Sequence, residues 1–118
     1  MMGAQDRVTV WAGDAQDASR LNDWAGQVDL VTARAFGRPA LVVECGQPFL
    51  SPDGSIVVSD PPEADADRWP AADLKAAGLT AASVTLEDAR FTVLHRTDGG
   101  PVRLPLRSRK AMEASPLF

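Results

Sequence analysis

The stretch Val28-Asp29-Leu30-Val31-Thr32-Ala33 decides the fold of this chain. It is mostly apolar and contains β-branched residues, which predicts a strand buried on both faces. Strands of this kind belong to parallel sheets whose faces are covered by the helices of βαβ crossovers. The stretch therefore predicts an α/β fold, and the remaining elements are placed around it.

Other segments of the chain alternate between strand and helix patterns. Four further runs favour strands, at residues 7–11, 55–59, 82–86 and 91–96. A helix is expected after Gly13-Asp14, with Leu21, Trp24 and Ala25 as its apolar stripe, and a short one within residues 69–79, closed by Gly78. Residues 39–50 predict another helix, with Leu41, Val42, Cys45 and Phe49 on one face.

The order of these elements predicts a mainly parallel sheet with helices on both faces. Residues 51–54 (Ser-Pro-Asp-Gly) and 98–101 (Asp-Gly-Gly-Pro) favour turns, and residues 60–67 form an acidic loop. The short connection at residues 87–90 predicts a hairpin, with an antiparallel strand at or near one edge. We expect a partial α/β domain over residues 1–101 and a basic C-terminal tail over residues 102–118.

The composition bounds the class of protein. A chain of 118 residues suits one domain, and its apolar and charged fractions of 45% and 24% are those of an ordinary globular protein. No apolar run is long enough for a transmembrane helix, and the N-terminus lacks a secretory signal pattern, so we expect a cytoplasmic protein. The single cysteine, Cys45, excludes an internal disulfide and a four-cysteine zinc site.

Charge is distributed unevenly along the chain. Residues 1–95 carry a net charge of −7, whereas residues 96–118 carry +3. The basic end is either a solvated, poorly ordered terminus or a segment that binds anions. Its cationic residues are Arg96, Arg103, Arg107, Arg109 and Lys110.

Four stretches together resemble one enzyme family. They are residues 10–17 (VWAGDAQD), 28–36 (VDLVTARAF), 50–58 (LSPDGSIVV) and 107–118 (RSRKAMEASPLF). They resemble RsmG (GidB), a family that methylates N7 of a guanine in small-subunit ribosomal RNA. The resemblance implies the C-terminal half of a class I, Rossmann-like methyltransferase sheet: three βα units, a terminal β-hairpin and a basic tail.

The resemblance implies S-adenosylmethionine as cofactor and ribosomal RNA as partner. It places Asp14, Ala15 and Gln16 in the loop against the adenine, although a helix N-cap at Asp14 needs no ligand. Arg34 lies at the carboxyl end of its strand, where it would contact cofactor or RNA phosphate, or else pair with Asp29 or Glu44. The tail residues implied to hold RNA phosphates are Arg103, Arg107, Arg109 and Lys110.

No catalytic acid or base is assigned, because guanine N7 has a free lone pair and the enzyme mainly aligns donor and acceptor. His95, the only histidine, lacks neighbours suited to a metal site. Ser59-Asp60-Pro61-Pro62 resembles the D/N-P-P-Y motif of amino-group methyltransferases, but Glu63 stands in the aromatic position, which favours an ordinary loop. A buried inert thiol is expected for Cys45, and packing roles for Trp11, Trp24 and Trp69.

The cofactor's glycine-rich loop has no counterpart in these residues, since no G-x-G-x-x-G occurs. Without the first two βα units of the family, the strand at residues 28–33 becomes an edge. We therefore expect a homodimer, aggregation or a complementing N-terminal polypeptide. Two functions remain open: an RsmG-type methyltransferase that is incomplete alone, and a non-catalytic remnant or RNA- or protein-binding module.

Overall fold

The computed structural model describes residues 13, 15, 17–18, 24–34, 38–61, 68–97, 104–105 and 107–118. Ala15, Asp17 and Ala18 are helical, where a helix was expected after Gly13. The predicted strand at residues 7–11 and the predicted turn at 98–101 lie outside the described residues.

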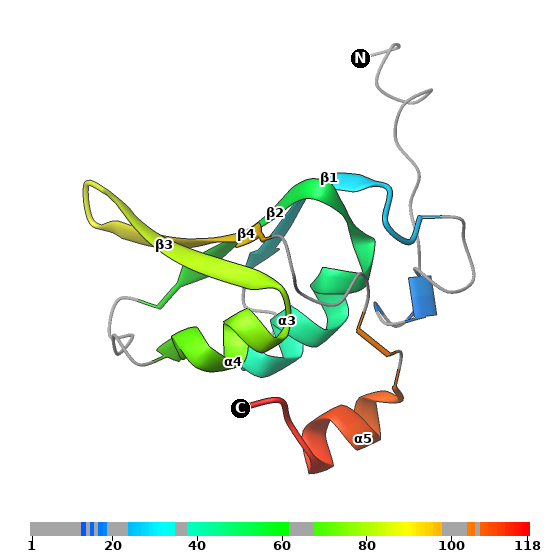
Figure 1. Ribbon diagram of the computed structural model, residues 1–118. Coiled ribbons are helices and arrows are strands. Elements are labelled where there is room, and N and C mark those ends of the chain that lie inside the picture. The colour runs from blue at the N-terminus through cyan, green and yellow to red at the C-terminus, as the bar shows by residue number, and fades with distance from the viewer. Residues whose placement is uncertain are drawn as a thin grey trace.

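Four strands form one mixed sheet in the order β1-β2-β4-β3 (Figure 1). The strands are β1 Val28–Arg34, β2 Leu50–Asp60, β3 Leu79–Leu86 and β4 Ala89–Arg96. β1 pairs with β2 in parallel, and β4 pairs antiparallel with both β2 and β3. This confirms the α/β class, the parallel pair and the terminal hairpin, whose connection is only Glu87 and Asp88.

The helices are shorter than the sequence pattern predicted. They are α3 Pro39–Gly46, α4 Ala71–Ala76 and α5 Arg109–Ala114, with the 3-10 turn η1 Gln47–Phe49 after α3. The helix expected over residues 39–50 ends at Gly46, because Pro48 has no N–H to donate and its ring clashes with the preceding turn. The expected closure by Gly78 is confirmed, since this residue follows α4 with a φ of 76°. None of the helices within the described parts of the chain is long and apolar enough to cross a membrane.

The helices α3, α4 and α5 lie on one side of the sheet (Figure 1). For these three, the expectation of helices on both faces is wrong. The cause is the direction of the crossovers. Right-handed connections from β1 to β2 and from β2 to β3 progress across the sheet in the same direction, which puts both helices on the same face.

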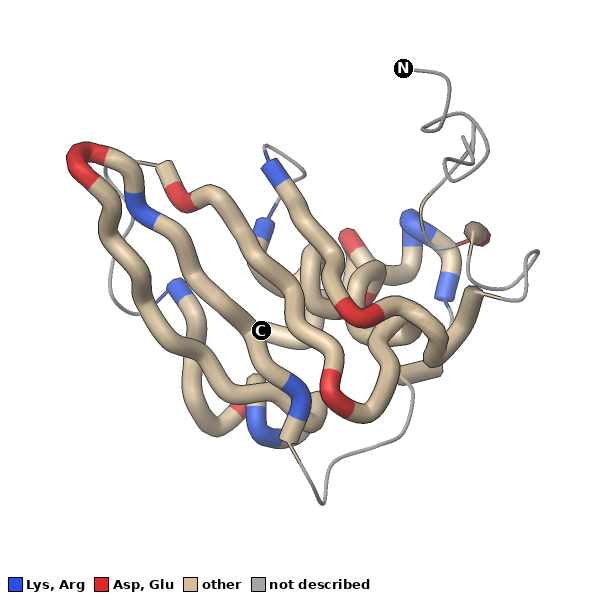
Figure 2. The backbone as a smooth tube through the Cα atoms, turned by 90° about the horizontal axis from the view of Figure 1, so that it is seen from above, with Lys and Arg blue, Asp and Glu red and all other residues tan. Residues whose placement is uncertain are grey.

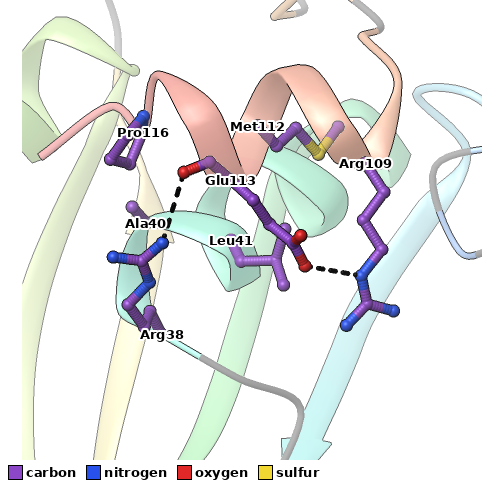
Figure 3. Close-up of a pocket in the computed structure, with 7 residues that line it drawn as sticks. All are labelled: Arg38, Ala40, Leu41, Arg109, Met112, Glu113 and Pro116. Atoms are coloured by element: carbon purple, nitrogen blue, oxygen red, sulfur yellow. Dashed lines mark hydrogen bonds and ion pairs between the residues drawn. The ribbon is translucent and has the colours of Figure 1, made fainter.

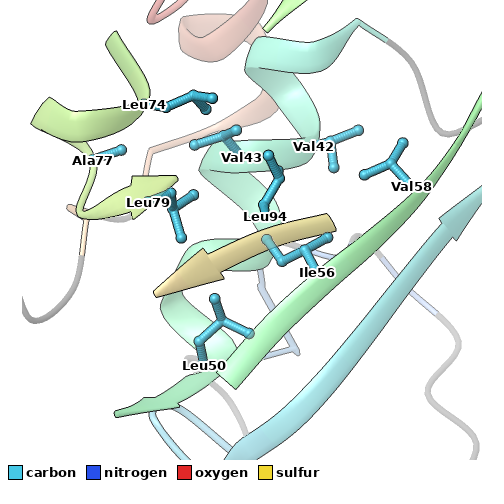
Figure 4. Packing of buried hydrophobic residues seen from close by; sticks show 9 residues of the cluster. All are labelled: Val42, Val43, Leu50, Ile56, Val58, Leu74, Ala77, Leu79 and Leu94. Carbon is cyan, nitrogen blue, oxygen red and sulfur yellow. The ribbon is translucent and has the colours of Figure 1, made fainter. Parts of the chain in front are cut away.

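The core lies between this face and the helices (Figure 4). Side chains from β2 and β4 meet those of α3 and α4, and the largest of them are completely buried. The cluster comprises Val42, Val43, Leu50, Ile56, Val58, Leu74, Ala77, Leu79 and Leu94. On α3 the buried surface is wider than predicted, since Glu44 is buried beside Val42 and Cys45.

β1 departs from the expectation of burial on both faces. Val31 and Ala33 pair with Ile56 and Val58 and pack against the core, but Leu30 is 57% exposed. The reason is its position: β1 is an edge of the described sheet, as expected from the resemblance, and α3, α4 and α5 cover one face only.

Residues 51–54 do not form a simple turn but lie inside β2 as an irregularity of the ladder. Val28 pairs with Leu50 and Leu30 pairs with Ser55, so six residues of β2 oppose three of β1. Gly54 allows this close approach, because a Cβ there would lie 2.9 Å from the carbonyl oxygen of Val28. The Pro-Asp-Gly signal therefore marks a bulge that redirects the strand.

Candidate functional site

The carboxyl ends of β1 and β2 form the edge where open α/β sheets bind their ligands. β1 ends at Arg34, which pairs in register with Ser59 near the end of β2. Figure 2 shows a basic residue at the end of β1 and acidic residues at the tip of the β3–β4 hairpin. α3 begins at Pro39, shortly after β1, so its positive end belongs to the same edge.

Asp60, the last residue of β2, organises one part of this edge. Its side chain is 8% exposed and forms an ion pair with Arg68, whose Nε lies 3.3 Å from Oδ1. Trp69 Nε1 donates to Oδ1 at 3.1 Å, and Thr92 Oγ1 donates to Oδ2 at 2.5 Å. The Arg68 guanidinium also stacks 5.8 Å from the centre of the Trp69 ring. These contacts give Asp60 a structural role, because they fasten the end of β2 to the residues before α4. Of the loop expected at residues 59–62, Ser59 and Asp60 belong to β2 and Pro62 lies outside the described residues.

The C-terminal tail is fastened to α3 by a buried carboxylate. Glu44 has a side chain that is 3% exposed, and it accepts from Arg107 Nε at 2.6 Å and from Nη2 at 2.5 Å. Nη2 of Arg107 also donates to the carbonyl oxygen of Ser115 at 2.8 Å. The hydrogen bond with Glu44 is the main cause that raises the pKa of Arg107 above its ordinary value. We call this bidentate pair the Glu44–Arg107 clamp. It fastens Arg107 of the tail to α3, and the bond from Arg107 to Ser115 holds the end of the tail to the same place.

Two further contacts hold the tail against the core. Gln47, buried after α3, donates through Nε2 to the carbonyl of Ala77 at 3.3 Å, and its Oε1 accepts from the Leu104 N–H at 2.8 Å. Met112 of α5 is buried, with its Sδ 3.7 Å from Sγ of Cys45. Cys45 is thus the buried thiol that the sequence predicted. The described tail residues form part of the packed molecule.

A pocket of about 290 Å³ opens between the start of α3 and α5 (Figure 3). Arg38 and Arg109 lie on either side of it, and Glu113 lies between them. Arg109 Nε donates to Glu113 Oε1 at 3.0 Å, and Arg38 Nη2 donates to the Glu113 carbonyl oxygen at 3.4 Å. Its lining residues are Arg38, Ala40, Leu41, Arg109, Met112, Glu113 and Pro116.

The predicted site residues fall into different surroundings. Arg34 is exposed and forms no ion pair with the described residues, so the expected pairing with Asp29 or Glu44 is not seen. Asp29 accepts instead from Ser51 Oγ at 2.7 Å. Ala15 is helical and half-buried, whereas Asp14 and Gln16 of the expected adenine loop lie outside the described residues.

The four predicted RNA-binding residues also differ from one another. Arg107 is held by Glu44, and Arg109 borders the pocket. Lys110 is exposed in the first turn of α5. Arg103 lies outside the described residues. Of the three described residues, Arg109 is the one that lines the pocket between α3 and α5.

His95 and the described tryptophans, the remaining candidates, contact other residues within the fold. His95 lies in β4 with Nδ1 at 2.7 Å from Ser55 Oγ on the neighbouring strand. No group of three metal-ligating side chains occurs among the residues that the structure describes. Trp69 packs against the core and donates to Asp60, as expected of a packing residue; Trp24 is half-buried, and Trp11 lies outside the described residues.

The sequence interpretation missed the partners of these arginines. It assigned no role to Glu113 or Gln47. The i,i+4 spacing of Arg109 and Glu113 was a readable signal for their helical pair. By contrast, Glu44 and Arg107 are 63 positions apart, and no local pattern reports such a contact.

Comparison with known proteins identifies the fold. No protein-family model matches the chain, and no curated protein matches it in sequence. Among solved structures, it is similar to an O-methyltransferase family protein from Burkholderia thailandensis, with a TM-score of 0.58 and 15% identity over 82% of this chain. A putative DNA modification methylase from Thermus thermophilus matches with a TM-score of 0.47 and 16% identity over 91% of this chain.

The chain spans 38% of the first of these proteins and 60% of the second. The similarity to the Burkholderia protein shows that the four-stranded mixed sheet and its helices match part of a methyltransferase fold.

Proposed function

We propose that this chain is the C-terminal part of an S-adenosylmethionine-dependent methyltransferase of the RsmG type, acting on guanine N7 of small-subunit ribosomal RNA. The observation that supports it most is the parallel pair β1–β2, with β1 at the edge of the described sheet. In a doubly wound sheet the fourth strand lies between the first and the fifth. The blocks at residues 28–36 and 50–58 that resemble RsmG contain β1 and most of β2, which fit the fourth and fifth strands.

The proposed reaction asks little of the protein beyond alignment. When bound, S-adenosylmethionine would supply an electrophilic methyl group, and guanine N7 would accept it through a free lone pair. Because N7 carries no proton to remove, no general base would be needed. What the protein must supply is a fixed approach of base to methyl group and charge complementarity to cofactor and RNA.

The described residues fit the cofactor in part. Arg34 offers an exposed guanidinium at the carboxyl end of β1, suited to a carboxylate or a phosphate. The glycine-rich loop that holds the methionine portion is not present in the sequence. Under this proposal, cofactor binding requires a glycine-rich loop in addition to these residues.

A complementation experiment tests the proposal. The full chain is purified alone and together with a polypeptide that carries the first two βα units of an RsmG protein. Cofactor affinity is measured by calorimetry, and methyl transfer to small-subunit RNA is measured with radiolabelled S-adenosylmethionine. We expect binding and transfer only in the combined sample. A stable combined complex that binds no cofactor would refute the methyltransferase proposal, whereas transfer by the chain alone would refute the need for complementation.

Arg34→Ala and Lys75→Ala make a matched pair for this assay. Both remove one exposed cation, but Arg34 ends β1 whereas Lys75 lies in the last turn of α4, before β3 begins at the opposite edge. We expect Arg34→Ala to lower methyl transfer about tenfold or more, the loss typical of a charged contact, and Lys75→Ala to leave it unchanged. Equal transfer by both variants would remove Arg34 from the proposed site.

The second candidate function is a non-catalytic RNA-binding module with a methyltransferase-like fold. The pocket between α3 and α5 favours it, because this pocket is formed without β1 or any cofactor loop. RNA binding by the chain with no cofactor binding in either sample of the complementation experiment would support this function over the first.

A further inference from the structure

The pocket between α3 and α5 combines an apolar floor with a charged rim. Leu41, the buried Met112 and Pro116 supply the apolar surface. Arg38 and Arg109 stand on opposite sides, as Figure 3 shows. Its volume of about 290 Å³ is near the lower end for small-molecule sites, which suits one nucleotide unit better than a large cofactor.

An internal carboxylate lies between the two guanidinium groups. Glu113 bonds Arg109 through its side chain at 3.0 Å and Arg38 through its carbonyl oxygen at 3.4 Å. The side chains of Arg109 and Glu113 are 56% and 54% exposed. Exposed pairs of this i,i+4 type are weak, so an external anion can replace the Glu113 carboxylate at small cost.

We propose that this pocket binds a phosphate group of single-stranded RNA, held between Arg38 and Arg109 after the Glu113 carboxylate has turned away. The proposal deepens the proposed function and rests on its RNA-binding part. Guanidinium groups bind phosphate oxygens through two parallel hydrogen bonds, which favours phosphate as the ligand. The floor of Leu41, Met112 and Pro116 favours a phosphate attached to a sugar over the free, hydrated ion.

The neighbouring charges support a polyanion as partner. Lys110 follows Arg109 in the first turn of α5 and is exposed. α3 begins at the pocket, so the positive end of its dipole adds positive potential there. Glu113 is the one acidic residue among those that line the pocket. Its carboxylate therefore competes with RNA for the Arg109 guanidinium.

The test measures RNA affinity of the full chain by fluorescence anisotropy with a labelled oligoribonucleotide of about 12 nucleotides. Arg38→Ala and Arg109→Ala are expected to weaken binding about three- to tenfold each and to reduce the salt dependence, as the loss of one phosphate contact does. Glu113→Gln is expected to strengthen binding about twofold or more, because it removes the competing carboxylate. Arg38→Lys is expected to weaken binding, since lysine keeps the charge but loses the planar fork.

Matched controls separate the pocket from a general charge effect. Lys75→Ala and Asp73→Asn change the charge by the same amounts on α4, whose residues 73 and 75 are exposed. We expect both to leave RNA affinity within twofold of the unchanged chain. If these two control variants change RNA affinity as much as the pocket variants do, the proposal is overturned, and RNA is attracted by the overall charge of the chain instead. Melting temperatures of all variants confirm that they are folded.

A competition experiment makes two distinctions. It separates recognition of phosphate from the general screening of charges by salt, and it separates binding of free phosphate from binding of a nucleotide phosphate. Inorganic phosphate should release the oligoribonucleotide more strongly than chloride at equal ionic strength. A mononucleotide should compete better than inorganic phosphate. Equal release by phosphate and chloride would overturn the proposal. If Arg38→Ala and Arg109→Ala bind RNA as tightly as the parent chain, the proposal for this pocket is overturned, but RNA binding by the chain is not. If neither the parent chain nor any variant binds RNA, both the pocket proposal and RNA binding by the chain are overturned.

Discussion

The two faces of the sheet use the same strands in opposite ways. On one face Ile56 and Leu94 pair across β2 and β4 and are completely buried under α3 and α4. On the other, their neighbours Val57 and Val93 also pair, yet both are only half-buried. Leu30 of β1 and Leu86 of β3 are 57% and 63% exposed. An apolar pattern therefore selects a strand but does not decide whether the face it offers is covered.

The difference teaches where this part of the molecule obtains its stability. The covered face holds the buried cluster, and the tail adds a further layer on α3 through the Glu44–Arg107 clamp. The opposite face holds apolar side chains that another chain packed on it would bury. Substitutions on the two faces should accordingly differ in kind: on the covered face they lower stability, and on the opposite face they alter association.

The largest difference is expected between Leu94→Ala and Val93→Ala. Leu94 is completely buried in the central strand β4, so its truncation should cost about 3 kcal/mol of unfolding free energy. Truncation of the neighbouring Val93 should lower the unfolding free energy by less than about 1 kcal/mol, because part of its side chain is already exposed to water. Urea unfolding monitored by tryptophan fluorescence measures both. Similar costs for the two variants would show that the opposite face is as well packed as the covered one.

The next effect concerns the bulge that joins β1 to β2. Gly54→Ala places a Cβ 2.9 Å from the Val28 carbonyl oxygen and 3.1 Å from Leu50 Cβ, so backbone must move. We expect a loss of about 1–3 kcal/mol, the usual cost of overpacking.

Gly46→Ala is its control. The new Cβ there meets the end of the Ile56 side chain, Cδ1, at 2.8 Å, and alanine favours a helix. We expect a change of less than about 1 kcal/mol in the same unfolding assay. A larger loss at Gly46 than at Gly54 would show that the core beneath α3 is the less adaptable of the two places.

A third prediction sets the Glu44–Arg107 clamp against the exposed pair of Arg109 and Glu113. Arg107→Ala leaves a buried carboxylate without its bidentate partner, so the melting temperature should fall. Arg109→Ala removes an exposed i,i+4 pair and should leave the melting temperature nearly unchanged. Differential scanning calorimetry measures both melting temperatures. An equal fall in melting temperature for both variants would contradict the assignment of the Glu44–Arg107 clamp as the pair that stabilises the fold.

The clamp should also respond to pH in a defined way. Glu44 raises the pKa of Arg107, so the stabilisation from this arginine is fully present below its unfolded pKa and is lost only as pH rises through the folded pKa. That window lies far above neutrality. The difference in melting temperature between the parent chain and Arg107→Ala should therefore stay constant from about pH 7 to about pH 10.

Local patterns predicted the elements of the fold better than their surroundings. The run at residues 28–33, the β3–β4 hairpin and Gly78 after α4 were readable, because each depends on side-chain type or backbone freedom within a few residues. The exposed Leu30 was not, since burial depends on which neighbours pack on a strand. Placement of α3 and α4 on one face follows from the strand order, which no local pattern contains.

The candidate site shows the same division. The sequence marked Arg34 as a contact for cofactor or RNA phosphate and Arg109 as a contact for RNA phosphate, and both side chains are exposed. It grouped Arg107 with Arg109 because composition treats them alike. Their different partners come from tertiary contacts: a buried glutamate far away in the sequence for one, and a glutamate one helical turn away for the other.

The smallest effect on stability, with the clearest effect on association, is expected for Leu30→Lys. Leu30 lies on the edge strand β1, and a lysine there should change the unfolding free energy by less than about 0.5 kcal/mol. A charge on an exposed edge opposes pairing with another strand, so self-association of the chain and its binding to a complementing polypeptide should both weaken. Sedimentation velocity over a range of concentrations measures the first, and co-purification measures the second. Leu117→Lys, at an exposed position of the C-terminus, is the control and should change neither. A Leu30→Lys chain that associates as strongly as the parent would place the contact surface elsewhere than the β1 edge, and the proposed union of this sheet with further strands would lose its geometric basis.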